Sequence, residues 1–430
     1  MKRTLALVLL VTILLGIGKT RAYATDMGFG GEYRIRGWWL GKYNVDDRLG
    51  PEEDSAYWDQ RFRLTMETKL VDNVQGFVRL LVSDNDAWDS QEARPGNREV
   101  DFDLAYLKLN VPYTPFALKL GRIDLRLGHY LVLGSTMTYD ALLAEGAQQG
   151  PESVQYGVFT AKIHEGRKSA YEDDIDLYGA YLNMLPQPDF NVGLFGVFGN
   201  HAGKETVNRI VDSTASNFDN AFNQAFWIGV TSDVTMDPLK FQFEFDYSQL
   251  TLDKASTGYA DDTSATGFAA YGNISGMVAN MNIGGSVLYA SGDENGLSTN
   301  PEDRDSFSPI RSTFSDMNKY DLITLYWVRN DVLTNIMAYQ IYLEGKMLND
   351  KIAAKLSAQY YQLDKAETIP GVAEPREKTI GTEIDARFSY NIFENLTFTG
   401  KAGLLLTDDE YFGADSDNIW LLGHEWVLSF

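Results

Sequence analysis

Apolar and polar residues alternate along much of this chain with a period of two. Between Leu239 and Ser248 every odd-numbered residue is Leu, Phe or Tyr, and every even-numbered residue is polar. Because successive side chains of a β-strand point to opposite faces, this segment predicts a strand with one apolar and one polar face. It is about ten residues long, which is the length that a tilted strand needs to cross the hydrocarbon layer of a membrane.

The same alternation recurs from one end of the chain to the other, for example over residues 29–43, 58–70, 380–390 and 396–406. The polar faces of these segments carry charges of both signs, which a dry core rejects unless they are paired. A water-filled lumen accepts such a face, and so does the solvated face of a sheet in a soluble protein. The two ends of the chain favour the lumen of a membrane barrel over the soluble sheet.

The first 24 residues have the features of a secretory signal peptide. Two basic residues precede an apolar run over residues 5–17, and Ala22 and Ala24 provide the small residues of a cleavage site. The run is too short to span a membrane as a helix, so we expect cleavage; a retained N-terminal anchor is the alternative. We therefore expect a signal peptide over 1–24 and one barrel domain over 25–430.

The chain ends in an aromatic residue that continues an alternating segment. Trp420, Leu422, Trp426 and Leu428 share one face and lead to the C-terminal Phe430. A closing strand of this kind resembles the signal that the assembly machinery of the bacterial outer membrane reads. This resemblance implies that the chain is inserted into the outer membrane, with lipid and lipopolysaccharide as its surroundings.

Short and long connections alternate along the chain, as in barrels with short periplasmic turns and long external loops. Seven short turns marked by Pro, Asn or Asp alternate with eight long polar connections, except around residues 127–152. A strand from Tyr130 to Thr138, followed by a long periplasmic connection over 139–152, restores the alternation. Leu322 to Val328 must then lie inside a long loop over 292–334.

This count predicts an all-β fold, a transmembrane antiparallel up-and-down β-barrel of about 18 strands. A barrel of 16 strands results if the weak strand and its partner are dropped. Either barrel pairs all backbone groups within the sheet, as lipid requires. At this size the barrel leaves an aqueous lumen that side chains alone do not fill.

Arginines are concentrated on the polar faces of the first predicted strands. A guanidinium stays charged and presents a planar fork to carboxylates, so such a cluster would attract anionic solutes. Alternatively, the arginines pair with acidic residues and brace a wet barrel, or opposed positive and negative walls combine both roles. The expected pore-lining residues are Arg34, Arg36, Arg61, Arg63, Arg79, Arg122, Asp101 and Asp103. The 292–334 segment is long enough to narrow the pore.

Composition adds further constraints. The chain has no cysteine, which excludes thiolate metal sites, iron–sulfur clusters and covalently attached c-type haem in this chain, and we expect neither a metal nor a cofactor. The formal charge of −23 reflects acidic predicted loops, which keep an exposed rim soluble; we expect no nucleic-acid partner. The acidic segment 83–89 could supply calcium ligands but lacks the Gly that an EF-hand loop requires.

Catalysis has little support in the sequence. The four histidines, His129, His164, His201 and His424, lie outside any recognisable catalytic motif, so we expect no enzyme and no catalytic residue, and an outer-membrane hydrolase is the least favoured function. The main alternative to a channel is a barrel scaffold that sheathes a periplasmic or extracellular partner such as a multihaem cytochrome. In that case the haems would belong to the partner.

Short stretches of the chain resemble a known family. Residues 105–109 (Ala-Tyr-Leu-Lys-Leu), 120–122 (Leu-Gly-Arg) and Gly128, together with 288–293 (Leu-Tyr-Ala-Ser-Gly-Asp), resemble motifs of alginate-export-type outer-membrane porins. The sequence departs from them at Ile123, where the family usually has Gln. The resemblance implies an 18-stranded channel in the outer membrane of a Gram-negative bacterium. We therefore expect passive diffusion or export of small hydrophilic solutes, including anionic ones.

Overall fold

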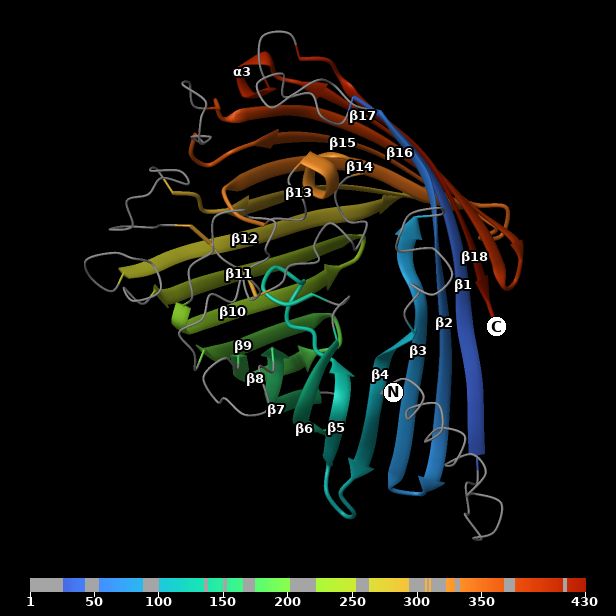
Figure 1. Ribbon diagram of the computed structural model, residues 1–430, viewed down its shortest axis with the longest axis vertical. Coiled ribbons are helices and arrows are strands. Elements are labelled where there is room, and N and C mark those ends of the chain that lie inside the picture. Colours follow the sequence, from blue (N-terminus) through green and yellow to red (C-terminus); the bar gives the residue numbers. More distant parts are fainter. Residues whose placement is uncertain are drawn as a thin grey trace, which may run out of the picture.

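Eighteen β-strands follow one another around a single closed sheet (Figure 1). Each strand pairs antiparallel with its neighbours in the sequence, and β1 pairs with β18, which closes the barrel. The strands are β1 (Asp26–Gly41), β2 (Ser55–Val71), β3 (Val74–Ala87), β4 (Val100–Asn110), β5 (Phe116–Asp124), β6 (Thr138–Gln148), β7 (Ser153–His164), β8 (Ile175–Gln187), β9 (Phe190–His201), β10 (Phe222–Met236), β11 (Leu239–Leu252), β12 (Thr263–Val278), β13 (Met281–Ala290), β14 (Ile336–Met347), β15 (Ile352–Gln362), β16 (Thr379–Phe393), β17 (Leu396–Thr407) and β18 (Ile419–Ser429). The predicted 18-stranded barrel is confirmed, and the 16-stranded version is wrong.

This computed structural model describes residues 26–42, 54–87, 100–134, 138–148, 150, 153–164, 175–201, 222–252, 263–293, 306–307, 309–310, 322–328, 333–366, 376–412 and 416–430. The predicted signal peptide over 1–24 lies outside these residues, and the single domain over 25–430 stays a prediction. The side chains of the acidic segment 83–89 also lie outside the described part.

Within the described residues, two short helices accompany the strands: the π-helix η1 (Thr324–Val328) and the α-helix α3 (Asp409–Phe412). In the described part of the chain, no helix is both long and apolar enough to cross a membrane. The π-helix lies between β13 and β14, so the apolar run Leu322 to Val328 belongs to a long connection, as the alternation of turns and loops predicts.

Short and long connections alternate without exception around the barrel. All seven short turns that the sequence predicts join neighbouring strands, and the eighth short connection is 149–152, between β6 and β7. The predicted strand from Tyr130 to Thr138 and the predicted connection over 139–152 are wrong, because β6 occupies Thr138–Gln148 and the long connection precedes it. The apolar run of Leu131, Val132 and Leu133 is fully buried and lies inside the barrel instead of facing lipid.

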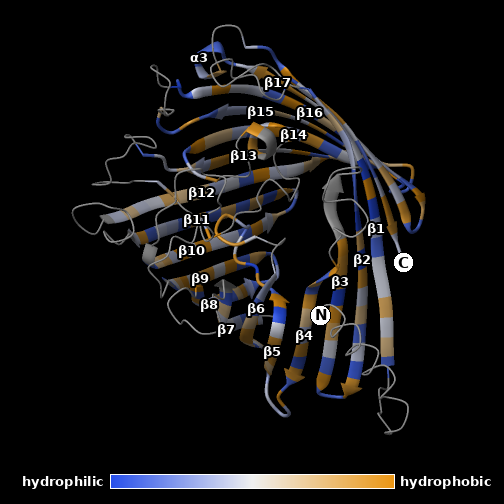
Figure 2. Cartoon of the chain, viewed as in Figure 1, coloured by the Kyte–Doolittle hydropathy of each residue, from blue (hydrophilic) through white to orange (hydrophobic). Residues whose placement is uncertain are grey.

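Large apolar side chains cover the outer face of the barrel, unlike the surface of a soluble protein. On β11, Phe243 and Phe245 are 46% and 39% exposed. Glu244 lies between them in the sequence and Asp246 follows Phe245, and both are fully buried. Figure 2 shows hydrophilic and hydrophobic residues alternating along the strands. An outward apolar belt of this extent suits contact with lipid rather than with water, so the soluble-sheet alternative is rejected.

We expect a charge on this outer face to destabilise the barrel according to its depth. Ile341 lies in the middle of β14 and is 69% exposed, and Met347 ends the same strand on the same face. Ile341→Arg should lower the free energy of unfolding by about 2–4 kcal/mol, because it places a charge near the bilayer midplane. Met347→Arg, near the interface, should cost only about 0–1 kcal/mol. Urea unfolding of both variants in lipid vesicles compares the two, and equal losses would contradict a membrane belt centred on β14.

The inner face of the barrel has two layers. Near the long connections, buried apolar side chains from β1 and from every strand between β5 and β18 form one core. Near the short turns the inner residues are polar or charged. Along β1 the inner face passes from Arg34 and Arg36 through Trp38 to the buried Leu40. The expected wet lumen therefore describes the half near the short turns, and the half near the long connections holds an apolar core.

Parts of the long connections fill this apolar core. Residues 125–134 follow β5 into the barrel, and residues 322–328, with η1, enter between β13 and β14 (Figure 1). Phe307 and Ile310 are also buried in the core, which fits the expectation that the 292–334 segment folds inward. The sequence did not predict the inward course of 125–134.

Candidate functional site

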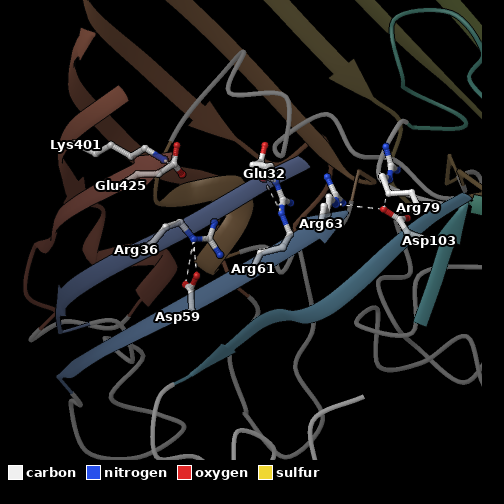
Figure 3. Close-up of polar contacts among 9 residues, drawn as sticks. All are labelled: Glu32, Arg36, Asp59, Arg61, Arg63, Arg79, Asp103, Lys401 and Glu425. Carbon is white, nitrogen blue, oxygen red and sulfur yellow. Dashed lines mark hydrogen bonds and ion pairs between the residues drawn. The ribbon is translucent and has the colours of Figure 1, made fainter. Parts of the chain in front are cut away.

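Basic side chains from β1, β2 and β3 gather on neighbouring inner positions of the barrel (Figure 3). Arg34 lies directly opposite Arg61 across the β1–β2 pair, and Arg36 lies opposite Asp59. Residues that face each other across antiparallel strands share one side of the sheet, so alternation along the strands brings these side chains together. Figure 3 draws Arg36, Arg61, Arg63 and Arg79 of this group, which form a row across neighbouring strands.

Each arginine of the first two strands that Figure 3 draws has an acidic partner on another strand. The Nε of Arg36 donates to both carboxylate oxygens of Asp59, at 2.8 and 3.1 Å, and the indole Nε1 of Trp38 donates to Oδ2 of Asp59 at 3.0 Å. The Nη2 of Arg61 lies 2.6 Å from Oε1 of Glu32. These contacts support the bracing role for part of the arginine cluster.

Asp103 on β4 joins two arginines. Its Oδ2 lies 3.2 Å from Nε of Arg63 and 2.6 Å from Nε of Arg79, and its side chain is only 6% exposed (Figure 3). One carboxylate between two guanidiniums leaves a net positive charge at this point of the wall. Asp101, two residues earlier on the same strand, is exposed.

Arg122 does not belong to this group. It lies opposite Asp140 across the β5–β6 pair, in the same alternating row as Leu120 and Leu142, and Leu142 is 44% exposed on the outer face. The register therefore places Arg122 on the outside, where its Nε donates to Oγ1 of Thr138 at 3.1 Å. The prediction that Arg122 lines the pore is wrong. Of the two consecutive residues Arg122 and Ile123, Ile123 is the one whose side chain is buried in the core inside the barrel.

Arg126, just beyond β5, also has an acidic partner. Its Nε donates to Oδ2 of Asp124 at 2.9 Å, and this hydrogen bond raises the pKa of the Arg126 guanidinium. The guanidinium therefore stays charged at the start of the inward segment.

Three further basic residues extend the row from the other end of the chain. Lys355 lies opposite Arg387, and Arg387 lies opposite Lys401, on β15, β16 and β17. Lys401 lies 3.4 Å from Glu425 of β18, and its Nζ is 5.1 Å from the ring centroid of Trp38. Sequence reasoning left these residues out of the site, although alternation places Arg387 and Lys401 on polar faces. Only the pairing of β1 with β18 makes them neighbours of the N-terminal arginines.

We call this continuous row the basic wall. Its eight basic residues come from six strands around the β1–β18 closure. Its carboxylates include Glu32, Asp59, Asp103 and Glu425, and Glu344 of β14 lies opposite Lys355. Basic side chains therefore outnumber the carboxylates in this row. The basic wall consists of Arg34, Arg36, Arg61, Arg63, Arg79, Lys355, Arg387 and Lys401.

An acidic group lies on the opposite side of the barrel. Asp233 on β10 and Glu244 and Asp246 on β11 face inward, and the last two are fully buried. In a ring of 18 strands, β10 and β11 are nine positions away from β1 and β2, so they lie across the lumen. The inner side of β10 and β11 thus carries acidic residues across the barrel from the basic wall, and opposed walls that line one pore stay a prediction.

Comparison with known proteins supports the fold. No protein-family model matches the chain, and no curated protein sequence matches it. Similar solved structures include Pseudomonas aeruginosa OccK9 (OpdG), at 11% identity and a TM-score of 0.59, covering 95% of this chain and 100% of that one. Pseudomonas aeruginosa OpdK with vanillate is 10% identical, with a TM-score of 0.55 and coverage of 94% and 98%. Acinetobacter baumannii OccAB4 is 12% identical, with a TM-score of 0.55 and coverage of 96% and 100%.

At these identities the likeness shows the fold alone. It is an outer-membrane porin fold, and OpdK is itself described as an outer membrane protein. The comparisons do not single out the alginate-export-type family that the short motifs resemble.

Proposed function

We propose that this chain is a channel of the Gram-negative outer membrane that passes small hydrophilic solutes by passive diffusion and favours anionic ones. The observation that carries the proposal is the basic wall, in which eight cationic side chains outnumber the carboxylates that lie among them. A surplus of fixed positive charge in a pore with low-dielectric walls raises the local concentration of anions. The similar OpdK was solved with vanillate, a carboxylate, which fits this preference.

The solute path runs along β2, β3 and β4. In the described part of the chain, the fully buried apolar core draws on β1 and β5 to β18, and on none of these three strands. The inward segments 125–134 and 322–328 pack into that core. A solute therefore passes between the apolar core and the basic wall, with Arg61, Arg63 and Arg79 along its way.

Charges on both sides of the lumen orient a solute as well as attract it. Positive charge on β1 to β3 and the partly exposed carboxylate of Asp233 on β10 create an electric field across the lumen, perpendicular to the path. Such a field aligns a polar solute, because its negative end turns toward the basic wall. Solutes with separated charges or a strong dipole should therefore pass more easily than apolar solutes of the same size.

Single-channel recording in planar bilayers tests the proposal. The purified barrel should conduct ions, and the reversal potential under a potassium chloride gradient should indicate preference for chloride over potassium. A folded barrel that never conducts would contradict the proposal and favour the sheath alternative. The structure gives the sheath little room, because segments 125–134 and 322–328 occupy the half near the long connections.

We infer that the last strand acts as the signal for the outer-membrane assembly machinery. Phe430 exchanges two backbone hydrogen bonds with Gly31 of β1, at 2.7 and 3.1 Å, and its ring stacks on Phe62 with centroids 6.1 Å apart. The terminal aromatic thus completes the closure between β1 and β18. A chain that lacks Phe430 should reach the outer membrane in smaller amounts when expressed in a Gram-negative host.

A further inference from the structure

The inward segment 322–328 is fastened to the barrel wall by one side chain. Glu383 of β16 accepts the backbone N–H of Leu322 and of Ile323 at Oε1, at 2.9 and 2.8 Å. Its Oε2 accepts the N–H and the hydroxyl of Thr324, at 2.9 and 2.7 Å. All of these groups are buried, so a single carboxylate satisfies three consecutive backbone donors that water does not reach.

The inward segment 125–134 is fastened in the same way from another strand. Glu244 of β11 accepts the backbone N–H of His129, and Gly128 lies directly against the same carboxylate. A Cβ at Gly128 would lie 2.2 Å from Oε1, and its φ of 59° favours glycine, so only glycine allows this approach. The Nε2 of His129 lies 3.5 Å from Oδ1 of Asp233 on β10, so a second acidic side chain lies beside this segment.

We propose that Glu244 and Glu383 are positioning residues that hold the two inward segments against the wall and thereby set the bore of the channel. The buried apolar contacts of these segments lack direction, whereas hydrogen bonds to a fixed carboxylate specify one position. Both glutamates lie on paired strands of the sheet, which gives them a rigid support. Loss of either carboxylate should release one segment and leave the other in place.

The role in setting the bore rests on the proposed channel, but the fastening of the segments can be measured without ion flow. The chain has no cysteine, so a single introduced cysteine is the only site for a thiol reagent. Ile323 and Val132 are fully buried in the two segments and serve as reporter positions through Ile323→Cys and Val132→Cys. The rate at which a charged, water-soluble methanethiosulfonate reacts with each reporter in refolded barrels in lipid vesicles reports how often that segment leaves the core.

Glu383→Ala should raise the reaction rate of the Ile323→Cys reporter about tenfold or more, because several charge-assisted hydrogen bonds to buried donors are lost. The Val132→Cys reporter should react as before in that variant. Glu244→Ala should give the converse result. Glu344→Ala is the matched control: Glu344 of β14 is also an inner glutamate, but it accepts a hydrogen bond from Asn282 of β13, and neither reporter should respond.

Unchanged rates in both variants would overturn the proposal, as would equal increases at both reporters in all three variants. If Glu383→Ala does not insert, Glu383→Gln retains the shape but presents an amide N–H₂ to the Thr324 donors, so its reporter should still react faster. In planar bilayers, Glu244→Ala and Glu383→Ala should spend more time in larger-conductance states than the unmodified barrel. Faster labelling with no change in conductance would uphold the fastening and overturn the role in setting the bore. A wild-type barrel that does not conduct would instead count against the proposed function.

Discussion

Replacing the four arginines of β1 and β2 by glutamine is expected to turn an anion-preferring channel into a cation-preferring one. Removal of their charge leaves the partner carboxylates Glu32 and Asp59 without neutralising neighbours. The part of the wall on β1 and β2 therefore becomes negative, and the row as a whole loses its positive surplus. The permeability ratio of chloride to potassium should fall by roughly tenfold, because several fixed charges beside a low-dielectric wall shift the local potential by more than kT. The residues replaced are Arg34, Arg36, Arg61 and Arg63.

The measurement is the reversal potential under a salt gradient, which should change sign. Arg122→Gln is the matched control, because it removes one arginine from the outer face of β5 and should leave the reversal potential unchanged. If the fourfold variant keeps the selectivity of the unmodified barrel, these arginines only brace the wall and the solute path lies elsewhere.

The second large effect is expected from Asp103→Asn. Asp103 is the shared partner of Arg63 and Arg79, and without its charge the two guanidiniums face each other with only 22% and 25% of their side chains exposed. Removing one partner of a largely buried ion pair is strongly destabilising, and the partial exposure of the arginines moderates it. We expect the free energy of unfolding to fall by about 2–4 kcal/mol.

Urea unfolding in lipid vesicles measures this loss, and Asp101→Asn provides the control on the same strand. Asp101 is exposed and should change the free energy of unfolding by less than about 0.5 kcal/mol. Asp103→Asn should also increase the preference for anions, since it adds one net positive charge to the path. Equal stability of the two variants would show that the Asp103 pairs contribute nothing to the fold.

Local patterns predicted most of the fold correctly. Strict alternation in segments such as Leu239 to Ser248 identifies the strands and their two faces, because the period of two is a property of each strand by itself. Turn residues such as Asp237 and Pro238 mark where the chain reverses, and they do so independently of distant contacts. The strand count follows from these two local signals.

The same signals failed at the run of Leu131, Val132 and Leu133, which was predicted as a membrane strand. An apolar run is consistent with contact to lipid and equally with burial inside the barrel, since both environments exclude water. The choice depends on whether an interior surface is available to receive it. Trp227 and the other apolar side chains near the long connections provide that surface, and it forms only after the barrel closes.

The sequence by itself determined that this chain is a barrel of alternating strands, where most strands lie, and that its polar faces carry arginines. Only the tertiary structure decided that Lys401 joins Arg36 in one basic wall, that Arg122 faces outward, and that the buried Glu244 and Glu383 hold segments inside the barrel. The physical reason is that alternation along a strand is local, whereas register and closure bring together residues that lie hundreds of positions apart.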